Sequence, residues 1–178
     1  MLRATGYRPT PDAEAARLGT VTLSFSDRFR RRIRLRLDDG QPFLLDLAEV
    51  TQLEHGGVLV VSGEGEIDIR AAVEAVVEVT SHDPAKVMRW AWHLGNRHLP
   101  VEFIGSTGLR VAADRVIAEM LIGLGAKPVE RQAPFAPEGG AYGGGPTYGH
   151  NHGHGHGHEH ERERSRGHDA AREGEHDH

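Results

Sequence analysis

Nine of the chain's 13 histidines lie between positions 150 and 178, at a spacing that favours metal binding. In an extended chain, a spacing of two residues places successive side chains on one side of the backbone. Neutral imidazole is a ligand for Zn, Cu, Fe and Ni, whereas oxygen ligands suit Mg and Ca. The candidate ligands are His150, His152, His154, His156, His158 and His160, with His168, His176 and His178 as weaker candidates.

The remaining composition narrows the kind of metal site. Cysteine is absent, which excludes disulfides, Cys-ligated zinc, iron–sulfur clusters and a thiol nucleophile. The lack of thiolate and the scarcity of methionine argue against Cu(I). The residues alone do not rank Ni(II) over Zn(II) or Cu(II), because selectivity depends on geometry and supply. An engineered purification tag and an accidental histidine bias are two other interpretations of this tail.

Composition also divides the chain near Gly149. Residues 150–178 contain only Ala170 and Ala171 as apolar side chains, too few to offset the entropy of ordering, so we predict a disordered tail. Residues 136–149 form a Gly/Pro-rich linker. The foldable part is then expected over roughly residues 17–135. Because ordering the tail costs about 1–2 kcal/mol per fixed residue, we expect several ions of moderate affinity.

The first part of the chain reads as short strands separated by glycine-rich turns. Period-two alternation and short apolar runs give five strand candidates, with no helical run between them. They are residues 20–25, 33–37, 43–47, 58–61 and 66–70. We therefore predict a small β-sandwich or open barrel as an N-terminal β-rich domain over residues 1–72.

The pattern changes after residue 72. A strand at 73–80 precedes a helix capped by Ser81 or Asp83, whose apolar stripe is Val87, Trp90, Ala91 and Leu94 and whose stop is Gly95-Asn96. Strands at 101–104 and 109–112 follow. Asp114 then caps a helix with an apolar face of Val116, Ile117, Met120, Leu121 and Leu124, and residues 128–132 supply a last strand. This β-α-β-β-α-β order predicts a ferredoxin-like domain over residues 73–135 and an α+β fold overall.

Two histidines, His93 and His98, lie near the end of the first predicted helix. A lone histidine there is more often a turn or packing residue than a metal ligand. The tail favours the metal interpretation, but one imidazole does not fill four to six coordination positions. A twofold dimer repeats the same surface patch on both subunits. His98 is therefore a candidate interfacial ligand, completed by tail histidines.

The run HLGNRHLP, from His93 to Pro100, resembles the signature of the UreE family, the nickel metallochaperones of urease assembly. The order of a β-rich, peptide-binding-like domain, a ferredoxin-like domain and a His-rich tail is similar to that family as well. The resemblance implies a homodimer joined through the C-terminal domains, with His98 binding Ni(II) at the dimer axis. It also implies delivery of nickel to the urease maturation GTPase and the urease apoprotein complex.

The sequence departs from the family pattern in one place. Some members carry extra histidines after the second strand of the ferredoxin-like domain, whereas this chain reads RVAADR from Arg110 to Arg115. We therefore assign no metal role there. His93 matches a frequent motif-leading histidine but is a weaker candidate ligand. His55 and His82 are interpreted as a loop residue and a residue of the helix-cap region.

Other function classes find little support. The chain has no phosphate loop, GxSxG or HExxH motif, so we do not expect an enzyme. The net charge of −5 and the lack of aromatics in strands 73–80 and 109–112 argue against nucleic-acid binding. No apolar run spans a membrane and no secretory signal is apparent, so we expect a cytoplasmic protein. A Ni or Zn storage or buffering protein without a dedicated client is the alternative function.

One basic cluster stands apart, the run RFRRRIRLRL at residues 28–37. As a strand it would place Arg30, Arg32, Arg34 and Arg36 on one face, opposite Ile33, Leu35 and Leu37. A solvated sheet face is one interpretation of this run. A docking surface for an acidic partner is the other.

Overall fold

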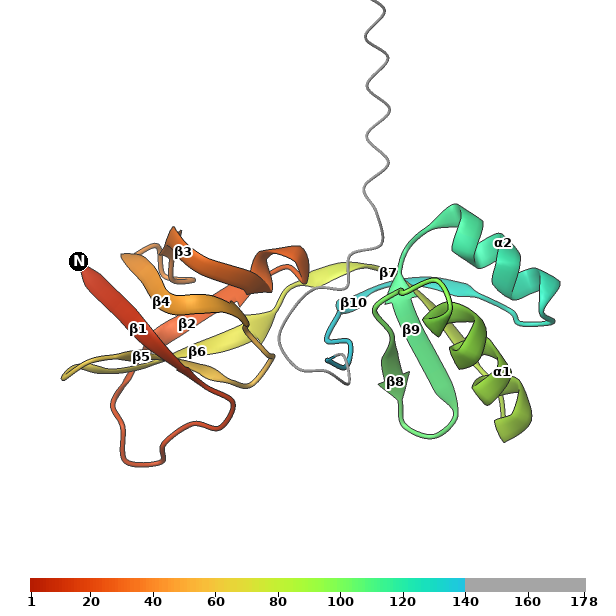
Figure 1. The fold of residues 1–178 in the computed structure, drawn as a ribbon, viewed down its shortest axis with the longest axis horizontal. Helices are drawn as coiled ribbons and strands as arrows, with labels where there is room; N and C mark the ends of the chain where they lie inside the picture. Colours follow the sequence, from red (N-terminus) through yellow and green to blue (C-terminus); the bar gives the residue numbers. More distant parts are fainter. Residues whose placement is uncertain (140–178) are drawn as a thin grey trace, which may run out of the picture.

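The computed structural model describes residues 1–139, which form two sheets side by side, with two helices on the second sheet (Figure 1). The predicted histidine-rich tail and most of the predicted linker lie outside these residues. Strands and helices are mixed, so the fold is α+β as predicted. Neither helix of the described part is long and apolar enough to cross a membrane.

The first sheet contains six strands, and all five predicted strands are among them. They are β1 (Leu2–Arg8), β2 (Arg17–Leu23), β3 (Phe29–Arg36), β4 (Pro42–Gln52), β5 (Val58–Val61) and β6 (Gly65–Ala71), with a short 3-10 turn, η1 (Ser26–Arg28), before β3. The strand order is β2-β6-β5-β1-β4-β3. β1 runs parallel to β4 and β2 runs parallel to β6, while the other neighbours are antiparallel.

This sheet curls until its two edge strands meet. The Asp38 N–H, in the turn after β3, donates to the Thr20 carbonyl on β2 at 2.8 Å. The Asp38 carboxylate accepts bonds from the N–H and hydroxyl of Thr22 at 2.9 and 2.8 Å. One continuous curled sheet favours the open barrel over a sandwich of separate sheets. Its interior is filled by buried apolar side chains, among them Ala4, Val21, Leu37, Phe43, Leu45, Leu59 and Ile67.

The prediction that the folded part begins near residue 17 is wrong, because β1 lies between β5 and β4 in the middle of the sheet. Ala4 is fully buried. A Cβ added to Gly6 would lie only 3.3 Å from the Cβ of Val60 on β5. Ala4 in the core and Gly6 opposite Val60 let β1 fit closely between its neighbours, and such small residues also weaken the apolar alternation that marks a strand in sequence.

The basic run at residues 28–37 does not present the single arginine face that its alternation predicts. The register between β3 and β4 shifts between Arg30 and Arg32. Arg30 is half-buried and pairs with Asp27, whereas Arg32, Arg34 and Arg36 stay exposed on one face of β3. Arg30, at the bulge in the ladder, therefore lacks the exposure of the other three arginines.

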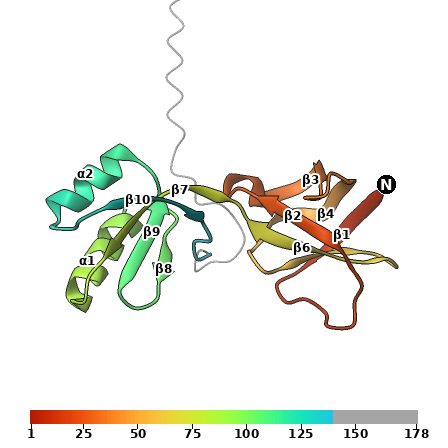
Figure 2. The same cartoon turned by 180° about the vertical axis from the view of Figure 1, so that it is seen from behind.

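The second sheet carries both helices on one face (Figure 2). Its elements are β7 (Val73–Thr80), α1 (Pro84–Gly95), β8 (Glu102–Ile104), β9 (Gly108–Ala112), α2 (Arg115–Gly123) and β10 (Val129–Pro134), in the predicted order. The strand order is β10-β7-β9-β8. The Asp83 and Asp114 side chains cap the helices, accepting bonds from the N–H groups of Ala85 and Ile117 at 3.0 and 2.9 Å.

The predicted apolar face of α1 is correct, but that of α2 is correct only in part. As predicted, α1 buries three side chains against the sheet: Val87, Trp90 and Leu94. In α2, Ile117 and Leu121 are buried, whereas Val116 is 69% exposed. Val116 lies about 100° around the helix from Ile117, on the side away from the core that Ile117 and Leu121 contact.

A buried arginine and three aromatic rings join the two sheets. Arg28 of η1 is 2% exposed, lies over the ring of Phe25 and donates to the Phe135 carbonyl beyond β10. The Phe25 ring packs edge-on against Phe29 and Phe135, each with a centroid separation of 5.4 Å. The Phe25 N–H also donates to the Glu74 carboxylate on β7 at 2.7 Å. These contacts hold the segment before β3 against β7 and against the end of β10.

Candidate metal site at the end of helix α1

Helix α1 ends in a turn built around His98. The His98 N–H donates to the Gly95 carbonyl at 2.9 Å, and the Leu99 N–H donates to the Leu94 carbonyl at 3.4 Å. This pair of bonds is the Schellman motif, whose C′ residue takes the left-handed conformation. Leu99 packs against the same core as Leu94. The predicted stop at Gly95-Asn96 matches the end of α1, but His98 is the left-handed residue.

The backbone of His98 is in an unusual conformation for a residue with a side chain. Its φ is 54°, and within residues 1–139 no other non-glycine residue has a positive φ. This conformation costs a non-glycine residue roughly 1–2 kcal/mol, although histidine tolerates it better than most. A histidine held where glycine is favoured points to a role for its imidazole.

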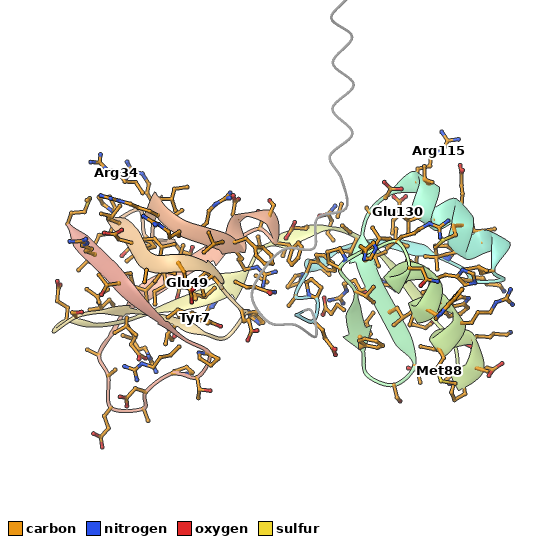
Figure 3. All side chains as sticks on the ribbon, in the orientation of Figure 1. Tyr7, Arg34, Glu49, Met88, Arg115 and Glu130 are labelled. Carbon is orange, nitrogen blue, oxygen red and sulfur yellow. The ribbon has the colours of Figure 1, made fainter. Side chains whose placement is uncertain are left out.

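Two exposed apolar side chains lie on α1, Trp92 in its last turn and Met88 one turn earlier. Met88 is 66% exposed and Trp92 is 62% exposed, one helical turn apart, and Figure 3 shows Met88 at the outer side of α1. His93 is half-buried, with its ring centroid 4.8 Å from that of Trp92. Met88 and Trp92 were not among the residues predicted from the sequence, although both are large apolar residues that lie off the buried stripe of α1.

No metal site is complete within the part of one chain that the structure describes. No group of three His, Cys, Asp or Glu side chains comes together there. His98 itself is exposed, and one imidazole leaves most coordination positions of a transition metal unfilled. The structure therefore does not bring the predicted ligands together. The tail candidates, His150 to His178, lie outside the described residues.

The segment after β10 returns toward the turn. The Ala136 N–H donates to the Glu102 carboxylate at 3.0 Å, and the Glu138 N–H donates to the Val101 carbonyl at 3.1 Å. Val101 follows His98 by three residues. The linker predicted from residue 136 therefore starts with residues that are hydrogen-bonded to the second sheet, beside the stretch that carries His98.

Arg110 stands in the stretch where the sequence lacks histidines. Its guanidinium donates to the Glu78 and Glu102 carboxylates at 2.7 and 2.9 Å and to the Pro134 carbonyl at 2.9 Å. Burial lowers the pKa of Arg110, but the two carboxylates outweigh it and leave that pKa raised. Arg110 therefore links its own strand, β9, to β7, to β8 and to the end of β10.

The two histidines interpreted as structural have surroundings that fit this interpretation. His55, in the loop before β5, accepts a bond at Nδ1 from the N–H of Ala71, the last residue of β6, at 3.3 Å. His82 is exposed in the loop before α1. Neither belongs to a cluster of donors in the described part of the chain.

Comparison with known proteins identifies both parts of the chain. The model of the UreE urease accessory protein N-terminal domain matches residues 4–72, and that of the C-terminal domain matches residues 74–178. The chain is 48% identical over 144 residues to the urease accessory protein UreE of Beijerinckia indica subsp. indica, covering 81% of this chain and 83% of that protein. It is 46% identical over 142 residues to UreE of Rhodopseudomonas palustris strain BisB18, covering 80% and 67%. The chain therefore belongs to the UreE family of urease accessory proteins.

Proposed function

We propose that this protein is a metallochaperone that binds Ni(II) and delivers it during maturation of the urease active site. Family membership supports the role in urease maturation. The observation that carries the nickel part is His98, an exposed imidazole fixed in a left-handed turn that favours glycine. Nickel is the cargo in this proposal, so a site with few rigid ligands suits its release.

The proposed folded site needs two copies of the chain. In a twofold homodimer joined through the second sheet and its helices, two His98 side chains face one Ni(II), because a twofold interface repeats the same patch. The exposed Met88 and Trp92 supply apolar surface that such a contact would bury. His93 remains a weaker candidate ligand, since its ring packs against Trp92.

In this proposal the tail binds further metal ions beyond the one at the folded site. Zn(II) and Cu(II) compete with nickel for imidazole, and binding weakens as the pH falls through about 6.5, where free imidazole takes up a proton. The proposed partners are the urease maturation GTPase and the urease apoprotein complex. The further ions bind at His150, His152, His154, His156, His158 and His160, and more weakly at His168, His176 and His178.

The same proposal includes the domain organisation. Residues 1–72 and 73–135 would be separate domains, which their two distinct apolar cores support. The second would be ferredoxin-like, supported by its β-α-β-β-α-β order and by the strand order β10-β7-β9-β8. The protein would act in the cytoplasm as a carrier and not as an enzyme, which agrees with a family described as accessory.

Nickel calorimetry with parallel light scattering tests the proposal. A chain ending at Gly149 should bind fewer ions than the full chain yet keep one ion per dimer. His98→Ala in the shortened chain should remove that ion. His82→Ala, which removes an exposed histidine just before α1, should leave it in place. A shortened dimer that binds no nickel, or that binds it equally well after His98→Ala, would refute the folded site.

The abundance of tail histidines favours a second candidate function, storage or buffering of divalent metals such as Ni and Zn without a dedicated client. Copurification with the urease maturation GTPase distinguishes the two. A chaperone should associate with the GTPase in a nickel-dependent manner. A buffer should bind the metal equally well and show no association, with or without nickel.

A further inference from the structure

The outward face of β1, β4 and β3 carries four exposed arginines. Arg32, Arg34 and Arg36 alternate with inward-facing residues along β3, and Arg3 lies on β1. Figure 3 shows Arg34 pointing away from the sheet into solvent. We call these four residues the arginine face.

The strand register places the arginines close together. Leu44 of β4 lies between Arg3 on one side and Arg34 on the other, and its side chain is partly exposed. Neighbouring strands are about 4.8 Å apart, and alternate residues of a strand are roughly 6.6 Å apart. The face is therefore a compact basic patch with one apolar side chain at its centre.

The patch has little internal charge compensation. Asp46 is the carboxylate paired with it in the described structure, and both Arg3 and Arg32 use this one group. The side chain of Arg34 has no ion pair or hydrogen bond within residues 1–139, and the guanidinium of Arg36 donates only to the Gly40 carbonyl at 2.9 Å. Leu44 and Pro42, the β4 residues opposite Arg34 and Arg36, carry no charge. If this face served only to stabilise the sheet, acidic residues would be favoured at those two positions, because they would pair with the arginines across the strands.

We propose that the arginine face is a docking surface for an extended, acidic segment of a partner protein. Guanidinium groups bind carboxylates through paired, planar hydrogen bonds, and alternate side chains of an extended segment have the same spacing as Arg32, Arg34 and Arg36. Leu44 offers apolar contact between them. This inference concerns a surface of the first sheet, and it stands whether or not the protein carries nickel.

The observations favour a protein partner over a nucleic acid. The arginine face has no aromatic side chain on which a base could stack. Asp46 lies within the patch and the whole chain has a net charge of −5, so an anionic partner is repelled more strongly the more charges it carries. A short acidic peptide carries fewer negative charges than a nucleic acid of the same length, so it is repelled less.

The test measures binding of a fluorescent twelve-residue peptide of alternating Glu and Ser to the full chain by anisotropy. Arg34→Gln combined with Arg36→Gln should weaken binding by about tenfold or more, because both groups lie at the patch and lack carboxylate partners. The matched control is Arg89→Gln with Arg115→Gln, which removes the same charge from the helices. Figure 3 places Arg115 on α2, far from Arg34. The control should change affinity by less than about twofold.

Two further arms complete the test. Arg34→Lys with Arg36→Lys keeps the charge but loses the planar fork, so it should recover only part of the affinity. Urea unfolding of each variant should give an unchanged midpoint, since the side chains are exposed. Absence of peptide binding by the native chain, an equal loss in the helix control, or tighter binding of a single-stranded RNA of the same length would overturn the proposal.

Discussion

The guanidinium of Arg28 donates a hydrogen bond to the carbonyl of Phe135, 107 residues further along the chain. Arg28 is almost fully buried, its guanidinium lies 5.5 Å from the centre of the Phe25 ring, and its Nε has no hydrogen-bond partner within the described residues. Burial lowers its pKa, while Glu74, Glu102 and Glu54 offset part of that effect. One buried cation thus ties the first sheet to the end of β10.

Replacing Arg28 should therefore destabilise the fold. Arg28→Ala removes the bond to Phe135, leaves a buried carbonyl without its donor and opens a cavity, so we expect a loss of about 3 kcal/mol in the free energy of unfolding. Urea unfolding measures it. Arg34→Ala, at an exposed site of similar sequence context, should change stability by less than about 0.5 kcal/mol. Equal effects of both substitutions would contradict the structural role of Arg28.

Replacing His98 with glycine should raise the stability of the fold but remove nickel binding at the folded site. His98→Gly relieves the left-handed strain and should raise the free energy of unfolding by about 1 kcal/mol while removing the folded nickel site. His93→Gly, inside the last turn of α1, should instead lower it by about 1 kcal/mol. Thermal unfolding and nickel calorimetry on the same samples check both effects. A His98→Gly variant that is less stable than the native chain would count against the strain.

The Asp46 carboxyl should titrate below its usual range. The hydrogen bond from Arg3 lowers its pKa most, and the charge of Arg32 adds to that effect. Its contribution to stability is therefore fully present above the unfolded pKa of about 3.9 and is lost as the pH falls through the lower folded value. Arg3→Gln should raise the pKa of Asp46, as followed by NMR. Arg34→Gln should have a much smaller effect, and no rise in the Arg3 variant would disprove the pairing.

Glu66 should hold the loop between β1 and β2. Its carboxylate is 1% exposed and binds Arg17, Arg8 at 3.2 Å and the Asp12 N–H at 3.1 Å. Glu66→Ala removes the buried carboxylate that these three groups share, so we expect a loss of about 2–3 kcal/mol and faster tryptic cleavage after Arg8 and Arg17. Asp68→Ala is the control, because Asp68 is 38% exposed and lies 3.9 Å from Arg17. Cleavage rates that match in the two variants would rule out this anchoring.

Elements with a strong local signal could be predicted from the sequence. Strands β5 and β7 have the bounds that their apolar runs indicate, and Asp83 and Asp114 cap the helices because short carboxylates satisfy exposed helical N–H groups. Strand β1 could not be predicted, since Ala4 and Gly6 give little apolar signal. The small size of Gly6 matters against Val60, on a strand more than fifty residues away.

Long-range features explain the remaining differences. The shift at Arg30 is set by how β3 pairs with β4, and the burial of Arg28 by the return of Phe135, so neither follows from local alternation. For the candidate site, the sequence indicates His98, but not the left-handed turn that holds it. That turn arises because Leu99 packs beside Leu94, while His98 alone takes the strained angle.

The hydrogen bond between Glu138 and Val101 sets a limit on distance. His150 comes twelve residues after Glu138, and twelve residues span at most roughly 43 Å even when fully stretched. Whatever path the chain takes, its first tail imidazole is confined to a small volume around the anchor, which corresponds to a local concentration in roughly the millimolar range. In the proposed function, an ion bound by that imidazole would meet the His98 turn as a tethered neighbour and would not have to find it by diffusion from bulk solvent.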